Sequence, residues 1–205
     1  MYEEMLRRAR QPLLIVVSGP SGVGKDTVLD RMKERGLPFH FVVTATSRAQ
    51  RPNEVEGKDY YFVSREEFIQ MIENDELFEN ALVYGEYKGI PKKQVDAALT
   101  SEKDVVMRVD VQGAETVREQ SPEAILIFLA TTNEKELVRR LKARRTETPE
   151  KLALRIDTSR QEMERVAGFD YYVVNRKDKL DETVDCILAI IRAEHARTQP
   201  KIVKL

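Results

Sequence analysis

Apolar residues recur along the chain in short runs, separated by segments with helical spacing. Five runs are strand-like, and they cover residues 13–17, 41–44, 105–109, 125–129 and 171–175. The run at 13–17 is wholly apolar, as expected of a central parallel strand buried on both faces. Helical stretches alternate with these runs, which predicts right-handed βαβ crossovers and a doubly wound α/β fold.

Two helices are predicted from local signals. Thr148 supplies a capping hydroxyl and Pro149 stands in the first turn, so a helix begins there, and it should end near Gly168. The last helix begins near residue 180. Its apolar face is formed by Leu180, Val184, Ile187, Leu188 and Ile191.

The pattern changes between residues 47 and 91. Short strands near 60–63 and 77–84 flank a helix near 65–74, and several glycines mark turns between them. This composition is typical of an inserted lobe and not of a buried parallel sheet.

Composition limits the location and the partners. With 34 basic and 35 acidic residues, the chain has no global basic field, so neither nucleic acid nor a membrane is an expected partner. No apolar run reaches the length of a bilayer span, and the acidic start does not fit a secretory signal. Cys186 is the only cysteine, which favours a reducing compartment. We therefore predict a cytoplasmic protein, and leave monomer and homodimer both open.

A phosphate-binding loop follows the first predicted strand and opens the first helix. The segment Gly19-Pro-Ser-Gly-Val-Gly-Lys25 fits the P-loop pattern through its lysine. Its glycines let backbone N–H groups face phosphate oxygens, and Lys25 bridges the β and γ phosphates of a bound triphosphate. The predicted ATP-binding residues of this loop are Gly19, Pro20, Ser21, Gly22, Val23, Gly24, Lys25, Asp26 and Thr27.

One position departs from the loop pattern. A serine or threonine that binds magnesium normally follows the lysine, whereas this chain has Asp26. Thr27 does not replace it, because one residue along a helix turns a side chain by roughly 100°. We therefore hypothesise that Asp26 binds Mg²⁺ directly or through water.

A second anion site is indicated after the second strand. Arg48 and Arg51 stand three residues apart, and guanidinium groups match phosphate oxygens bidentately. The Tyr60 hydroxyl could complete the same cradle. Two arginines in a loop are more often solvated, but the nearby triphosphate loop favours a phosphate cradle.

In combination these motifs resemble the guanylate kinase family. The resemblance rests on the phosphate loop, Ser47-Arg48-x-x-Arg51-Pro52, Gly57-Lys-Asp-Tyr60, Val109-Asp110-x-Gln112-Gly113 and Arg144-x-Thr146-Glu147, and it covers roughly residues 13–195. It implies an ATP:GMP phosphotransferase with a three-layer α/β/α fold and a central parallel sheet. The single domain, residues 1–205, would comprise core segments 12–46, 92–138 and 165–197, a GMP-binding lobe at about 47–91 and a lid at about 139–164.

The resemblance also implies how the acceptor base is selected. Glu79 matches the family position that reads guanine, whose N1–H and N2–H₂ donors a carboxylate accepts as a pair. Adenine presents an acceptor at N1 and leaves buried polar groups unpaired. Asp110 matches a carboxylate close to GMP and to the metal. By itself, Glu79 would be an ordinary exposed strand residue. The predicted GMP-binding residues are Thr44, Arg48, Arg51, Tyr60, Glu79, Lys88 and Asp110, with Asp26 and Asp110 as metal ligands.

Three residues depart from the family pattern in or near this lobe. Lys88 stands where a tyrosine is expected, and it can still reach the acceptor phosphate as a point charge. Ile90 offers no hydroxyl to the base. Arg108 occupies a position that is usually acidic in the family, so we assign it no role.

The lid and the ATP base contact complete the prediction. The resemblance places Arg140, Arg144 and Arg155 at lid positions, where they would act with Lys25 and Arg48 as catalytic cations, while Asn175 would contact the ATP base. The ordinary interpretation of the same stretch is a solvated basic helix end. Phosphoryl transfer needs alignment and charge neutralisation, and the GMP phosphate needs no general base, so His40 and His195 receive no catalytic role.

Two alternatives stay open from the sequence. A different P-loop monophosphate kinase would prefer AMP or dTMP over GMP. A guanylate-kinase-like interaction module would bind GMP without catalysis, and Asp26 is the one feature that favours it. Lys25 and the arginine pair favour the enzyme.

Overall fold

The computed structural model describes residues 11–52, 54–83, 85–143, 148–201 and 203. Its core is a five-stranded parallel sheet in the order β2-β7-β1-β8-β9, which confirms the predicted α/β architecture. These strands are β1 (Leu14–Ser18), β2 (His40–Phe41), β7 (Val105–Arg108), β8 (Ile125–Ala130) and β9 (Tyr171–Val174). In the middle of the sheet, Val16 of β1 pairs with Met107 on one side and Leu126 on the other.

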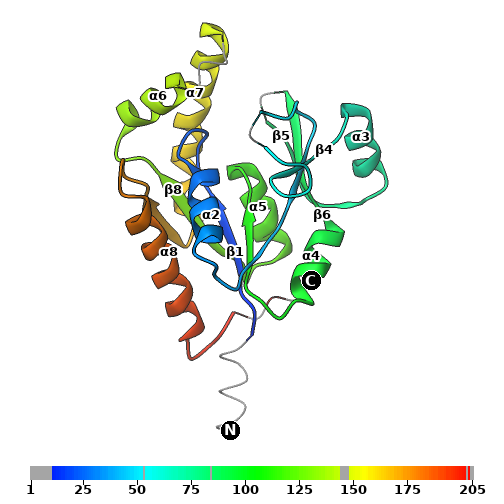
Figure 1. The fold of residues 1–205 in the computed structure, drawn as a ribbon, viewed down its shortest axis with the longest axis vertical. Helices are drawn as coiled ribbons and strands as arrows, with labels where there is room; N and C mark the ends of the chain where they lie inside the picture. The colour runs from blue at the N-terminus through cyan, green and yellow to red at the C-terminus, as the bar shows by residue number, and fades with distance from the viewer. Residues whose placement is uncertain (1–10, 53, 84, 144–147, 202, 204–205) are drawn as a thin grey trace.

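Helices cover both faces of this sheet (Figure 1). Alternate residues of β1 point to opposite faces, so Ile15 and Val17 pack with α2 (Lys25–Glu34) and α8 (Leu180–His195). Leu14 and Val16 pack on the other face, in a cluster that contains residues of α4 (Lys92–Leu99) and α5 (Val111–Gln120). The predicted apolar face of the last helix is confirmed, because its residues join the first cluster.

A second sheet forms the inserted lobe, at the right of Figure 1. Its strand order is β4-β3-β6-β5, with β3 (Thr44–Thr46), β4 (Tyr60–Phe62), β5 (Leu77–Val83) and β6 (Glu86–Pro91). The helix α3 (Arg65–Glu73) lies beside it. A capping box fixes the start of α3, because Ser64 accepts from the Glu67 backbone while the Glu67 side chain accepts from Ser64.

The single strand predicted at residues 41–44 is wrong. The chain leaves the core sheet after Phe41 and enters the lobe sheet at Thr44, so one apolar run serves two sheets. β6 and α4 were not predicted, since Gly89 looks like a turn residue. Gly89 instead lies inside β6, where a Cβ would stand 2.7 Å from the Glu79 carbonyl oxygen. The close approach of two strands explains the glycine.

Two helices project from the upper end of the core in Figure 1, namely α6 (Glu134–Ala143) and α7 (Pro149–Glu164). The predicted start of α7 is confirmed, because the Thr148 side chain accepts a hydrogen bond from the Lys151 backbone. A short 3₁₀ helix, η1 (Arg165–Gly168), ends this segment where the sequence predicted. Within the described ranges, no helix is both long and apolar enough to cross a membrane.

Candidate active site

The phosphate loop joins β1 to α2 at the carboxyl end of the central strand. Gly19, Gly22 and Gly24 have φ of 133°, 89° and 95°, which residues with a side chain rarely adopt. At Gly19 a Cβ would also lie 2.1 Å from the Leu129 carbonyl oxygen. The Lys25 ammonium lies over the loop and donates to the carbonyls of Gly19 and Pro20. Burial lowers the Lys25 pKa, and a bound phosphate would favour the charged form.

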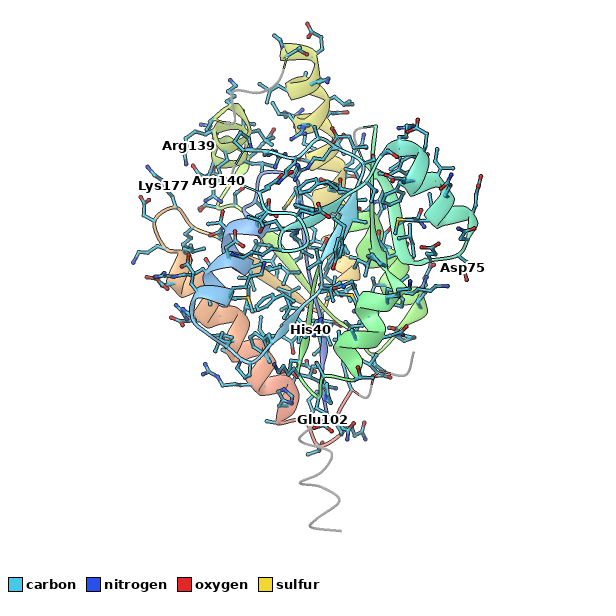
Figure 2. All side chains as sticks on the ribbon, turned by 45° about the vertical axis from the view of Figure 1, so that its right-hand side comes forward. His40, Asp75, Glu102, Arg139, Arg140 and Lys177 are labelled. Atoms are coloured by element: carbon cyan, nitrogen blue, oxygen red, sulfur yellow. The ribbon has the colours of Figure 1, made fainter. Side chains whose placement is uncertain are left out.

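Two predicted residues, the lid arginine Arg140 and the ATP-base contact Asn175, support this loop from outside the cavity. Arg140 donates from Nη1 to the Val23 carbonyl at 3.0 Å and from Nη2 to the Asn175 carbonyl at 2.9 Å. The Asn175 amide also donates to Val23, at 2.8 Å. Figure 2 shows Arg140 beside Arg139 on α6. In this structure both residues hold the loop backbone, and their contacts to the phosphoryl group and the ATP base stay predictions.

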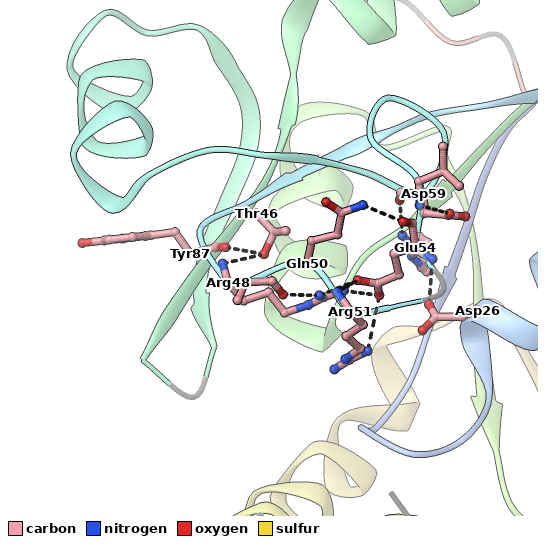
Figure 3. A network of polar contacts seen from close by, with 11 residues as sticks. Asp26, Thr46, Arg48, Gln50, Arg51, Glu54, Asp59 and Tyr87 are labelled. Atoms are coloured by element: carbon pink, nitrogen blue, oxygen red, sulfur yellow. Dashed lines mark hydrogen bonds and ion pairs between the residues drawn. The ribbon is translucent and has the colours of Figure 1, made fainter. Parts of the chain in front are cut away.

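The predicted arginine cradle faces the phosphate loop, and a carboxylate holds it in place (Figure 3). Arg48 is buried and donates from Nη1 to Glu54 at 2.7 Å, while Arg51 pairs with the same carboxylate at 3.5 Å. The Arg48 guanidinium also lies 4.7 Å from the centre of the Tyr60 ring. Glu54 was not predicted from the sequence, although its position three residues after Arg51 is a signal for such a pair. A bound phosphate dianion would compete with Glu54 for both arginines.

Glu79 and Lys88 come from the adjacent strands β5 and β6. Glu79 is only 3% exposed, which excludes the interpretation as an ordinary surface residue. Burial, reinforced by the nearby Asp110 carboxylate, raises the pKa of Glu79 to about 8. Burial likewise lowers the pKa of Lys88 to about 8. A buried carboxylate and a half-buried ammonium group whose pKa values are both shifted to about 8 are characteristic of a functional site.

Asp110 follows β7 and caps α5. Its Oδ1 accepts hydrogen bonds from the backbone N–H groups of Gln112 and Gly113, at 2.9 and 3.1 Å. Two residues earlier, Arg108 ion-pairs with Asp26 at 2.7 Å between Nη1 and Oδ1. We assigned Arg108 no role from the sequence. Its place at the carboxyl end of a core strand, where α/β proteins bind ligands, is the signal that could have identified it.

The phosphate loop and the lobe line one cavity, and this cavity brings most of the side chains described above together. Most predicted site residues line it: Pro20, Ser21, Gly22, Gly24, Lys25, Asp26, Thr44, Arg48, Arg51, Tyr60, Glu79, Lys88, Asp110 and Arg155. Arg108, Val83, Glu86 and Val109 also line it without having been predicted.

Several predicted residues lie elsewhere. Gly19, Val23, Thr27, Arg140 and Asn175 are outside the cavity lining, and Arg144 lies outside the described residues. His195 pairs with Asp104 at 2.8 Å, and Figure 2 shows His40 well below Arg140. Neither histidine lines the cavity.

A P-loop on a parallel sheet, which shares its cavity with two arginines of an inserted lobe, is characteristic of P-loop phosphotransferases. Comparison with known proteins specifies the family. The sequence profile of guanylate kinase matches residues 11–194, which is most of the chain. The chain therefore belongs to the guanylate kinase family, and guanylate kinase function follows from this membership.

Named relatives agree with the assignment. The chain is 52% identical to guanylate kinase 2, chloroplastic/mitochondrial, of Oryza sativa over 98% of this chain and 71% of the relative. It is 42% identical to a guanylate kinase of Halalkalibacterium halodurans, covering 94% of this chain and 93% of the relative. The crystal structure of guanylate kinase from Anaplasma phagocytophilum superposes with a TM-score of 0.76 at 33% identity, covering 91% and 88% of the two chains.

Proposed function

We propose that this protein transfers the γ-phosphate of ATP to GMP, giving ADP and GDP. The observation that carries the proposal is the cavity itself, because Lys25 of the phosphate loop and the Arg48–Arg51 cradle line the same space. An interaction module needs no such alignment of a donor and an acceptor site. The names of the relatives support the catalytic interpretation as well.

ATP would bind as its magnesium complex. Among the described residues, no cluster of three or more metal-ligating side chains exists, so the ion would take most of its ligands from phosphates and water. Asp26 and Asp110 both line the cavity and offer the oxygen ligands that magnesium prefers, so the residues fit an ion delivered with ATP. When bound, the ion would neutralise phosphate charge.

GMP would bind between the two lobe strands and the arginine cradle. Arg48, Arg51 and Lys88 supply charge for its phosphate, and Tyr60 supplies a hydroxyl. The buried carboxylate of Glu79 would accept the two guanine donors, and the low dielectric around it would make a mismatched base costly.

Transfer then requires alignment more than covalent chemistry. An oxygen of the GMP phosphate attacks the γ-phosphorus, the bond from that phosphorus to the β–γ bridging oxygen breaks, and ADP leaves with the bridging oxygen. Lys25 and Arg155 line the cavity where charge develops on the transferred group. Closure of the lobe and the lid would exclude water, which would otherwise hydrolyse ATP.

Steady-state kinetics with ATP and a panel of nucleoside monophosphates test the proposal. GMP should have the highest kcat/KM, and Lys25→Ala should lower kcat by about 100-fold or more, the size of the loss of a main transition-state donor. Lys33→Ala, which removes a lysine from the far end of the same helix, serves as the matched control. A higher kcat/KM for AMP or dTMP than for GMP would indicate another monophosphate kinase. GMP binding without GDP formation would indicate an interaction module.

Location and assembly belong to the same proposal. The sequence agrees with a cytoplasmic enzyme that acts only on small molecules. Such an enzyme would be a monomer or a homodimer. The printed name of the rice relative, chloroplastic/mitochondrial, describes that protein. Fractionation and gel filtration of this chain would decide both points.

A further inference from the structure

Asp26 and Arg108 come from different parts of the fold and meet in the lining of the cavity. Asp26 is in the first turn of α2, immediately after the phosphate-loop lysine, and Arg108 is the last residue of β7. Their atoms Oδ1 and Nη1 are 2.7 Å apart. A serine or threonine, which the loop pattern places at position 26, could not neutralise an arginine there.

The other contacts of Arg108 reach into the acceptor lobe. Its Nη2 donates to the Asp59 carbonyl at 3.1 Å, and its guanidinium carbon lies 4.3 Å from the centre of the Tyr60 ring. Asp59 and Asp26 lie at the same end of the network drawn in Figure 3, away from Tyr87. Arg108 therefore contacts the donor loop through Asp26 and the acceptor cradle through residues 59 and 60.

Burial makes the ion pair necessary. The Arg108 side chain is 12% exposed, and a guanidinium stays charged at any physiological pH. A buried charge is stable only when it is paired with an opposite charge. Removing one member of such a pair therefore destabilises the protein more than replacing both members does. The Asp26 side chain is 42% exposed, so it meets both the solvent and the cavity.

We propose that Arg108 is a positioning residue for GMP, and that Asp26 acts on GMP binding through Arg108. The pair holds the Asp59–Tyr60 segment at the distance from the phosphate loop that the acceptor phosphate requires. A residue of the donor loop thereby determines affinity at the acceptor site. This inference rests on GMP being the acceptor.

GMP binding measured by calorimetry in EDTA, without ATP, isolates this role because no metal is present. Arg108→Met should weaken GMP binding about tenfold, and Asp26→Ser should weaken it several-fold, as expected of residues in one network. The double variant should bind no more weakly than Arg108→Met alone, because Asp26 then has no arginine to orient. Glu34→Ser, which removes a carboxylate from the exposed face of the same helix, should bind GMP like the unmodified protein.

Thermal melting provides a second readout that does not depend on binding. Asp26→Ser should melt several degrees below the double variant, since only the single variant leaves a buried cation unpaired. Arg108→Lys, which keeps the charge but loses the planar fork, should give an intermediate GMP affinity.

Four results would overturn the inference. If Asp26→Ser binds GMP in EDTA as tightly as the unmodified protein does, Asp26 acts only at the donor site. If the losses of GMP affinity in the two single variants add up in the double variant, Asp26 and Arg108 act on GMP binding independently. If the unmodified protein does not bind GMP, both this inference and the proposed function are wrong. If it binds GMP and the variants bind GMP with the same affinity, only the inference is wrong.

Discussion

At the scale of the residue, Glu79 shows how the fold changes the chemistry of a side chain. A glutamate ordinarily titrates near pH 4.5, but burial beside Asp110 raises the pKa of Glu79 to about 8, and Lys88 opposes the shift only in part. In the empty protein at pH 7 the group is therefore mostly protonated. To accept both guanine donors it must ionise, so GMP binding should release a proton from Glu79.

Calorimetry of GMP binding in buffers of different ionisation enthalpy measures this proton. At pH 7 the unmodified protein should release close to one proton more than Glu79→Gln, and the difference should vanish by about pH 9, above the raised pKa. The variant should also bind GMP at least about tenfold more weakly, because a charge-assisted hydrogen-bond pair is lost. Equal proton release at pH 7 would contradict the assignment of Glu79.

The same shift predicts a pH effect on stability. The folded-state pKa of Glu79 lies above its unfolded value, so the contribution of this group is complete below about pH 4.5 and is lost as the pH rises through about 8. Chemical unfolding of Glu79→Gln should therefore show a smaller loss of stability across this window than the unmodified protein does.

At the scale of the element, α5 and β5 position this carboxylate together. Gly113 lies in the first turn of α5, and a Cβ placed on it would be 2.3 Å from Oε1 of Glu79. The glycine therefore provides the space that the Glu79 carboxylate occupies. Elsewhere in a helix, alanine is more favourable than glycine by about 1 kcal/mol.

Gly113→Ala should separate the effect on the position of the Glu79 carboxylate from the effect on helix stability. The added methyl group would displace the Glu79 carboxylate, so GMP affinity should fall at least about tenfold, the size of a lost hydrogen bond to a charged group. The helix itself should not be weakened. Gly168→Ala is the matched control, since a Cβ there meets nothing within 4 Å. Unchanged GMP affinity in Gly113→Ala would show that the carboxylate does not need its present position.

At the scale of the whole molecule, the lobe and the core share one hydrophobic cluster. Ile90 and Phe78, from the lobe strands β6 and β5, pack in the same cluster as Leu14, Val16 and Met107 of the core sheet. Ile90 is fully buried. The lack of a hydroxyl at this position thus has a structural reason, because the side chain fixes the lobe to the core.

Ile90→Ala should destabilise the entire protein. We expect a loss of about 2–5 kcal/mol in the free energy of unfolding, or roughly 5–15 °C in Tm for a chain of this size. Unfolding followed by circular dichroism should remain a single transition. Leu82→Ala, at a 50% exposed position of the same lobe, should have little effect. Two separate transitions would contradict a shared core.

Features with local causes could be predicted from the amino-acid sequence alone. The phosphate loop was identified because seven consecutive residues supply its glycines and its lysine, and backbone N–H groups need no distant partner. The start of α7 at Pro149 and the apolar face of α8 follow equally from neighbouring residues. The alternation of strands and helices in the core was predictable for the same reason, whereas β6 and α4 were not predicted.

How charged groups pair, and how deeply they are buried, depends instead on contacts between segments that are distant in the chain. Asp26 and Arg108 are 82 residues apart in the chain, and no local pattern joins them. The burial that raises the pKa of Glu79, and the point where one apolar run leaves the core sheet for the lobe, also depend on packing between distant segments. Charge interaction and desolvation are set by distance in space, and the sequence encodes that distance only through the complete fold.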